Sequence, residues 1–304
     1  SLYFSFKDLD NVPGYIGYPH LGSYLWAFFW NVSLIDYEYT GRLSFIFVYL
    51  MIFFSLVDKL KVNSISKIFI LIFVISISYD MILIHGYQEP LMFSLCVIFM
   101  ILLEKIDYKN NNYLNYLLLI FCANLILWIK NEGMFFLLFL SFFILFKKKI
   151  LLKNKLILIS LFIFLIFIKK NIFIYLFGSV TVGWEGYKFL SIPELFSKEI
   201  IQRIPFLIFQ LFITFVKYPI YLVFILCFII TIIKDRKITS SLDFLVFFLI
   251  NLLMSASIFY FVNDPSWMHH AKVGLDRMLY QTSGVYLFYI LKFFEDIIPK
   301  RVLN

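Results

Sequence analysis

The chain has 304 residues, of which 62% are hydrophobic and only 15% are charged. A soluble domain has about 45–50% apolar and about 25% charged residues, and 40 phenylalanines with 20 tyrosines exceed what one water-soluble core hides. This composition excludes a cytosolic enzyme, a nucleic-acid-binding module, a disordered chain and a disulfide-stapled secreted domain. The net charge of +8 does not indicate a nucleic-acid partner, because the basic residues stand between apolar runs. We therefore predict a polytopic membrane protein.

Residues 1–41 are polar and aromatic and precede the first long apolar run. The chain starts at Ser1 without the basic, apolar and small-residue regions of a signal peptide, so we expect a further membrane helix upstream. Within this first outer loop, Leu21–Val32 is too short to cross a bilayer. Because Trp26 and Trp30 are typical of the membrane interface, we predict that Leu21–Val32 is a helix lying in the outer surface.

Residues 42–304 predict about nine transmembrane helices. A helix needs roughly 17–25 residues to cross about 30 Å of hydrocarbon, and long apolar runs favour helices over the alternating strands of a barrel. The predicted spans are Leu43–Val57, Ile68–Ile84, Pro90–Leu103, Tyr113–Ile129, Met134–Phe146, Leu156–Ile168, Pro219–Ile233, Leu242–Val262 and Gln281–Phe293. Ile200–Val216, with Arg203 and Gln210, is predicted as a second interfacial helix, in a central outer loop. We expect one all-α, membrane-embedded domain over residues 1–304.

Lysine and arginine are distributed unequally between the two sets of loops. One set carries sixteen positive and seven negative charges, and the other carries eleven positive and twelve negative charges. The net charges of +9 and −1 place the first set in the cytoplasm. The segments rich in Gly, Pro, His, Trp and acidic residues all fall on the opposite side: Lys7–Gly41, His85–Glu89, Lys130–Gly133, Lys169–Lys217 and Asn263–Gly284. We therefore expect the function on the extracytoplasmic face.

Ionisable residues within or beside membrane spans are costly, and they are therefore candidates for function. Asp80 falls near the outer end of the run Ile68–Ile84, where an acid can also simply reach the interface. His85 and Glu89 follow in a tight outer turn. Glu89 precedes Pro90 at a helix N-terminus, where the helix dipole stabilises a carboxylate. Capping explains Glu89 alone, but it does not explain the cluster of three ionisable groups.

Lys130 and Glu132 occupy a turn with almost no linker between two apolar runs. They are either a polar hairpin with a partly compensated ion pair, or a cation and an acid directed into a cavity between helices. Because unpaired charges are costly at this depth, we expect Lys130 and Glu132 to line the same cavity as Asp80 and Glu89.

The last outer loop contains His269, Asp276 and Arg277. His269 and His270 are adjacent and cannot share one helix face, so they are a poor metal pair. Arg277 stands four residues before Gln281, on one helix face, and a guanidinium at the membrane surface suits bidentate phosphate binding. It either binds a phosphate or pairs with an outer acid or a lipid headgroup.

Other chemistries lack their motifs. The chain has no Gly-rich nucleotide loop, no His-Glu-x-x-His and no Gly-x-Ser-x-Gly. Its three cysteines all lie in apolar stretches and act as small hydrophobes. We predict no metal site and no cofactor, although a requirement for a divalent metal stays open.

Five short motifs, in order and on the predicted outer side, resemble those of bacterial GT-C superfamily glycosyltransferases. They are Tyr18-Pro19-His20-Leu21-Gly22-Ser23 with Trp26 and Trp30, Glu38-Tyr39-Thr40-Gly41-Arg42, Gly86-Tyr87-Gln88-Glu89-Pro90, Lys130-Asn131-Glu132-Gly133 and Asp276-Arg277. Protein mannosyltransferases and the lipid A aminoarabinose transferase are members of this superfamily. The resemblance covers most of the chain.

The resemblance implies a multi-pass enzyme of the bacterial inner membrane with its active face outside. Such enzymes take a sugar from a polyprenyl-phosphate donor and pass it, with inversion, to a lipid, glycan or protein acceptor. It implies that Tyr18 and His20 belong to the donor site or cavity. The general base of the family is an acid just after the first membrane helix, which we expect upstream of Ser1. Asp8 and Asp10 are the only acids near that position.

Three other functions fit part of the pattern. A lipid-linked glycan transporter or flippase is also polytopic and basic, but it should carry charges inside several spans and functional loops on both faces. An O-antigen ligase or polymerase shares the carrier lipid and depends on a large outer loop, which Lys169–Lys217 resembles. A structural subunit without catalysis is favoured if no upstream acid exists.

Overall fold

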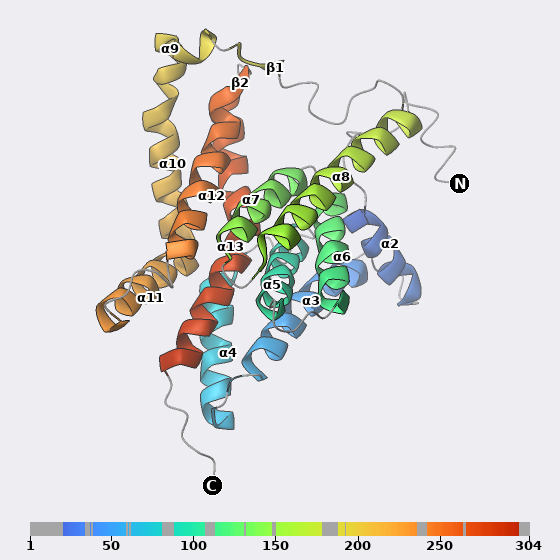
Figure 1. The fold of residues 1–304 in the computed structure, drawn as a ribbon, viewed down its shortest axis with the longest axis vertical. Helices are drawn as coiled ribbons and strands as arrows, with labels where there is room; N and C mark the ends of the chain where they lie inside the picture. The colour runs from blue at the N-terminus through green and yellow to red at the C-terminus, as the bar shows by residue number, and fades with distance from the viewer. Residues whose placement is uncertain are drawn as a thin grey trace.

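A computed structural model describes residues 21–33, 37, 39–58, 60, 62–80, 88–106, 113–130, 132–147, 150–177, 188–191, 193–235, 242–263 and 266–297. These residues form an all-α fold (Figure 1). The helices are α2 (Leu21–Val32), α3 (Tyr39–Asp58), α4 (Ser64–Ser78), α5 (Glu89–Lys105), α6 (Tyr113–Ile129), α7 (Gly133–Phe146), α8 (Leu152–Phe177), α9 (Lys198–Ile201), α10 (Arg203–Lys217), α11 (Pro219–Asp235), α12 (Leu242–Phe261) and α13 (Trp267–Ile297). The 3-10 turn η3 (Glu194–Phe196) and one antiparallel pair, β1 (Lys188–Phe189) with β2 (Val262–Asn263), complete the described elements.

Local signals explain several helix boundaries. Asn63 caps α4, because its side chain accepts a hydrogen bond from the Ser66 backbone N–H at 2.7 Å. Pro90 stands in the first turn of α5, where its missing N–H costs nothing. Tyr218 is extended before Pro219, as expected for a residue that precedes proline, and it separates α10 from α11.

Helix α5 is the centre of the bundle, with α3, α6 and α13 packed around it (Figure 1). Thirteen of its 17 residues are buried. The closest approach is to α13, where a Cβ on Gly284 would lie 2.4 Å from the Phe93 carbonyl oxygen. Only glycine allows the two backbones to come so near, and this contact fixes the two helices against each other.

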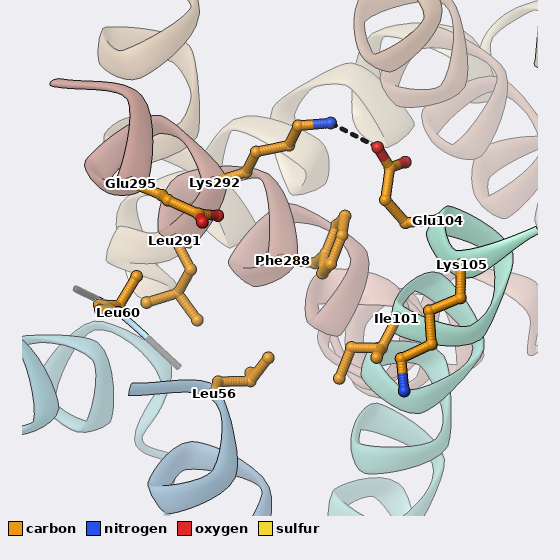
Figure 2. Close-up of a pocket in the computed structure, with 9 residues that line it drawn as sticks. All are labelled: Leu56, Leu60, Ile101, Glu104, Lys105, Phe288, Leu291, Lys292 and Glu295. Carbon is orange, nitrogen blue, oxygen red and sulfur yellow. Dashed lines mark hydrogen bonds and ion pairs between the residues drawn. The ribbon is translucent and has the colours of Figure 1, made fainter. Parts of the chain in front are cut away.

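The two ends of the bundle are named here from α5. The outer end is where α5 begins at Glu89, and the inner end is where α5 finishes at Lys105. At the inner end, Glu104 receives hydrogen bonds from Lys147 to Oε2 and from Lys292 to Oε1, both at 2.8 Å. A pocket of about 260 Å³ opens beside this ion cluster (Figure 2).

Large apolar side chains cover the outward faces of the helices. Phe47 on α3, Phe69 on α4, Phe121 on α6, Phe167 on α8 and Leu226 on α11 are each more than half exposed. In water such exposure forfeits about 25 cal/mol for each Å² of apolar surface, and contiguous apolar patches mark contact with another apolar phase. The outward faces therefore favour a lipid environment.

Among the described residues, two segments are long and apolar enough to cross a membrane, Tyr39–Asp58 and Lys198–Lys217, with 20 residues each. Four described helices are apolar but shorter: Ser64–Ser78, Tyr113–Ile129, Gly133–Phe146 and Pro219–Lys234. Length and composition thus support membrane association, while nine crossings stay a prediction. Lys198–Lys217 contains the segment that we predicted as interfacial, and by the same two criteria it also qualifies as a span.

Three predicted boundaries are wrong. Helix α8 continues to Phe177, beyond the predicted span Leu156–Ile168 and into the predicted outer segment Lys169–Lys217. Helix α4 ends at Ser78, so Asp80 lies just beyond a helix and not inside a span. Helix α13 begins at Trp267, whereas we expected an outer loop up to Gly284. Its upper part buries Ala271 and Leu275, one turn apart, whereas the sequence indicated a helical spacing only at Arg277 and Gln281.

Candidate functional site

Glu89 is the central residue of the outer end. It is the first residue of α5, where the helix dipole stabilises a carboxylate, and it is completely buried. An ionised carboxylate is costly to bury unless opposite charges and hydrogen bonds compensate it. The surroundings of Glu89 must therefore supply positive charge.

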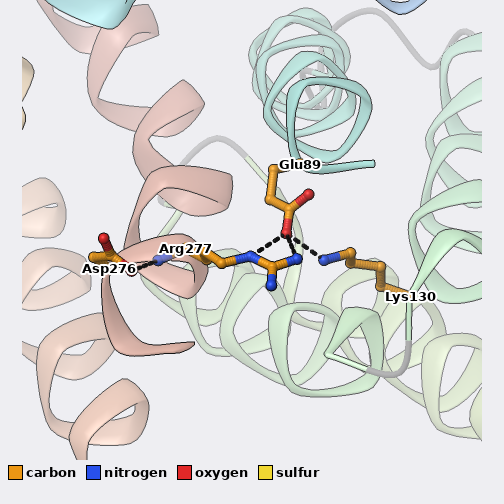
Figure 3. A network of polar contacts seen from close by, with 4 residues as sticks. All are labelled: Glu89, Lys130, Asp276 and Arg277. Carbon is orange, nitrogen blue, oxygen red and sulfur yellow. Dashed lines mark hydrogen bonds and ion pairs between the residues drawn. The ribbon is translucent and has the colours of Figure 1, made fainter. Parts of the chain in front are cut away.

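Two cations meet at a single oxygen of Glu89 (Figure 3). The Lys130 ammonium, which follows α6, donates to Glu89 Oε1 at 2.6 Å. The Arg277 guanidinium, on α13, donates to the same oxygen from Nε at 2.7 Å and also from an NH2 group. Lys130 is buried, whereas the Arg277 side chain is one-third exposed. A buried acid thus holds one buried cation and one that reaches the surface.

The second carboxylate oxygen of Glu89 receives neither of these cations. Within the described part of the chain, buried Oε2 makes no hydrogen bond. An unsatisfied buried acceptor costs about 1–3 kcal/mol, and more when it is charged. Such a group is a candidate for contact with water or a ligand.

A second set of charges lies next to this one. Lys217, at the end of α10, contacts Asp276 Oδ2 at 2.5 Å and lies 4.0 Å from Asp80 Oδ2. Asp276 precedes Arg277 on α13, and its Oδ1 accepts the Arg277 backbone N–H at 2.7 Å. Adding these to Glu89, Lys130 and Arg277, the outer end joins three acids and three cations from five separate segments.

Aromatic rings form a floor beneath these charges. Phe93, one turn below Glu89, stacks on Tyr280 with ring centroids 5.6 Å apart. Tyr280 also contacts the Tyr218 ring at 5.4 Å, and all three side chains are fully or almost fully buried. Because the rings exclude water, the ion pairs above them act in a lower dielectric and are stronger than at an open surface.

The first outer loop reaches the same end of the bundle. Gly22 is the second residue of α2, and a Cβ there would lie 2.4 Å from the Gln88 side chain. Gln88 is the neighbour of Glu89 in sequence. The described part of the motif Tyr18–Ser23 therefore packs beside the motif that contains Glu89.

Lys130 lies beside Glu89, as expected, since its ammonium donates to Glu89 Oε1, while a cavity shared with Asp80 and Glu132 stays a prediction. Glu132 is only half-buried, and the described residues leave its Oε2 without a hydrogen bond although that atom is buried. Burial lowers the pKa of Lys169, near the end of α8, and the charge of Glu132 partly offsets this effect. The Lys169 ammonium itself donates to the Leu127 carbonyl at 2.6 Å. Lys130 thus joins Glu89, whereas no hydrogen bond of Glu132 to that cluster is found among the described residues.

Not every predicted site residue can be placed in this cluster. His269 is exposed and lies two turns above Arg277 on α13, roughly 12 Å along the axis at 1.5 Å per residue. Asp8, Asp10, Tyr18, His20 and His85 lie outside the described residues. Among the described residues, no group of three or more His, Cys, Asp or Glu is arranged to hold a metal ion.

Sequence reasoning missed Lys217 as a site residue. It was noted only as the boundary of the outer segment Lys169–Lys217, although it stands directly before Tyr218-Pro219. A cation next to a helix break between two apolar runs is the signal that could have identified it. Its partners Asp80 and Asp276 are remote in sequence, so the pairing itself carried no local signal.

Comparisons with family models, curated proteins and solved structures find no match for this chain. The chemistry of the outer end therefore has to be argued from its geometry. A surface-reaching guanidinium, held by a buried acid beside a lysine, can bind an anion at the level of a membrane surface.

Proposed function

We propose that this chain is a multi-pass membrane glycosyltransferase of the GT-C type. In this proposal it transfers a sugar from a polyprenyl-phosphate donor to a lipid, glycan or protein acceptor outside the bacterial inner membrane. One observation carries the proposal: Glu89, Lys130, Asp276 and Arg277 converge from distant segments at one end of an apolar-surfaced helical bundle.

The spacing of the charges supports a transmembrane orientation of the bundle. Glu89 and Glu104 stand at the two ends of α5, and 15 residues of helix separate them by about 23 Å. This is close to the thickness of a hydrocarbon core, about 30 Å. Two charged layers with apolar surface between them are the pattern that a bilayer requires.

The donor chemistry suits the outer cluster. A polyprenyl chain is confined to the hydrocarbon, so its phosphate must rest at headgroup level. The departing phosphate needs no proton, but positive groups stabilise the charge that develops on it. Arg277 and Lys130 would supply that charge, with Glu89 holding both in position. The acid that activates the acceptor hydroxyl is expected in the first outer loop or upstream of it.

Arg277 provides the test. With its guanidinium removed, we expect Arg277→Ala to lose nearly all sugar transfer, because a contact that strengthens in the transition state is worth about 2–4 kcal/mol of barrier. Arg277→Lys should retain part of the activity, since it keeps the charge but not the planar fork. Transfer is measured as consumption of polyprenyl-phosphate sugar in membranes that contain the full-length protein.

Lys292→Ala is the matched control, because Lys292 holds Glu104 at the inner end in the same way. It should leave transfer almost unchanged at equal protein level. Near-normal turnover in Arg277→Ala would remove Arg277 from the site. Movement of the intact donor across the membrane without release of sugar would favour the transporter instead.

A further inference from the structure

The inner end of the bundle contains a pocket that the proposed reaction does not use. It has a volume of about 260 Å³ and lies between the inner ends of α3, α5 and α13 (Figure 2). Its walls are apolar: Leu56, Leu60, Ile101, Phe288 and Leu291. Three of these residues are nearly inaccessible from outside, with 8%, 5% and 4% exposure for Leu56, Leu60 and Leu291.

The rim of the pocket carries four charges, Glu104, Lys105, Lys292 and Glu295. Two of them are already matched, because Lys292 donates to Glu104. The other two, Lys105 and Glu295, are exposed, and no ion pair joins either of them to another of the described side chains. The rim thus offers one cation and one anion beside an apolar cavity.

We propose that this pocket binds a phospholipid of the inner leaflet whose headgroup carries both a phosphate and a primary ammonium, as in phosphatidylethanolamine. The lipid phosphate pairs with Lys105 and the ammonium with Glu295, while the start of an acyl chain covers the apolar walls. A headgroup of this kind carries an opposite charge for each of these two rim residues, and its chain is already confined to the phase that surrounds the bundle.

Other ligands match less well. An anionic headgroup such as phosphatidylglycerol satisfies Lys105 but leaves Glu295 facing a negative phosphate. A phosphatidylcholine headgroup has the same charges but no N–H, so it cannot donate a hydrogen bond to a carboxylate. A water-soluble anion gains nothing from the apolar walls. The inference requires a bilayer around the bundle but does not depend on sugar transfer.

Lipid binding by the purified, delipidated full chain tests the proposal. Phosphatidylethanolamine, phosphatidylcholine and phosphatidylglycerol with identical acyl chains are added in detergent, and the bound lipid is counted by native mass spectrometry. We expect phosphatidylethanolamine to bind at least about fivefold more tightly than either of the others. Equal binding of the three lipids, or tightest binding of phosphatidylglycerol, would overturn the proposal.

Variants locate the binding. Glu295→Gln should reduce the preference for phosphatidylethanolamine over phosphatidylcholine to less than about twofold. Lys105→Gln should weaken the binding of both of these lipids. Lys234→Gln, an exposed lysine at the end of α11 outside the pocket, is the matched control and should bind as the wild type does. Leu60→Phe fills the cavity and should reduce binding of all three lipids. If Glu295→Gln keeps the full preference, the assignment is wrong.

Discussion

Each end of helix α5 carries a glutamate with two cations, but the hydrogen bonding of the two carboxylates differs. At each end a glutamate on α5 receives one lysine that follows α6 or α7 and one cation from α13. At the inner end, Lys147 and Lys292 each take a different oxygen of Glu104. At the outer end, Lys130 and Arg277 both donate to one oxygen of Glu89, and no described group donates a hydrogen bond to the other.

Burial separates the two ends further. The Glu104 side chain is 24% exposed, whereas Glu89 is completely buried. A satisfied, partly solvated ion cluster braces helices at little cost. A buried cluster with an unsatisfied oxygen is expensive, and costly polar groups within a membrane protein mark function. The comparison shows that α5 is braced at its inner end, whereas at its outer end a buried acceptor has no hydrogen bond among the described residues, as the proposed ligand contact requires.

The largest expected effect comes from a matched pair of substitutions at these two glutamates. Glu89→Gln leaves Lys130 and part of Arg277 without a compensating charge, and breaking a buried pair costs about 3–5 kcal/mol. Glu104→Gln should cost about 1 kcal/mol or less, because solvent screens the remaining lysines. Unfolding free energies in detergent, measured by denaturant titration of both variants and the wild type, give the two values.

The two costs need to differ by at least about 2 kcal/mol for the comparison to hold. Equal costs would mean that the outer cluster is only a second brace. If Glu89→Gln were more stable than the wild type, the buried charge itself would be the burden, as replacement of some buried ion pairs has shown.

A substitution between the two ends should disturb both. Gly284 faces the Phe93 carbonyl and Val97, about two turns from each cluster along α13. Gly284→Ala adds a methyl group for which there is no space, and overpacking of this kind costs about 1–3 kcal/mol. We expect a lower melting temperature and, because α5 and α13 must separate, weaker sugar transfer.

Gly274→Ala is the control for that substitution. A Cβ at Gly274 lies 3.1 Å from the end of the Phe259 side chain, which can shift. It should therefore cost less than Gly284→Ala. The close approach of α5 and α13 would be unimportant if the two variants melted at the same temperature.

Much of the helical architecture could be predicted from the sequence, because apolar runs and the charges between them act locally. The helices α2 and α6 have the predicted bounds, Leu21–Val32 and Tyr113–Ile129. The contact of Lys130 with a nearby acid was also predictable, since sidedness placed both groups at one level. The identity of that acid was not, because Glu132 is two residues away whereas Glu89 is 41 residues away.

The remaining features depend on three-dimensional packing. The inner brace was missed because Glu104, Lys147 and Lys292 look like the ordinary charges that flank membrane spans. The contacts of Lys217 with Asp80 and Asp276 join α10 to two distant segments, and nothing in the spacing of these residues predicts them. The hydrophobic periodicity of the sequence cannot predict an apolar pocket, because such a pocket arises where three helices do not fill the space between them.

The smallest expected effect is the pH dependence of the inner brace. Glu104 lies beyond the predicted span Pro90–Leu103, at the inner end. Partial burial alone raises the pKa of Glu104, but Lys147 and Lys292 outweigh it, so that the pKa falls from its ordinary 4.5 to about 2. A carboxyl with a lowered pKa in the folded state stabilises the fold above its unfolded pKa, and the contribution is lost as pH falls toward the folded pKa. The difference in unfolding free energy between wild type and Glu104→Gln should therefore be constant above about pH 5.5 and shrink steadily between pH 4.5 and 2. Because the ion cluster is partly solvated, the whole change should not exceed about 1 kcal/mol.

The measurement is denaturant titration of wild type and Glu104→Gln across this pH range. The contributions of the other carboxyl groups cancel in the difference, because both proteins contain them. A difference that grows as the pH falls would show that the lysines do not stabilise the ionised form of Glu104, and the brace would lose its electrostatic basis.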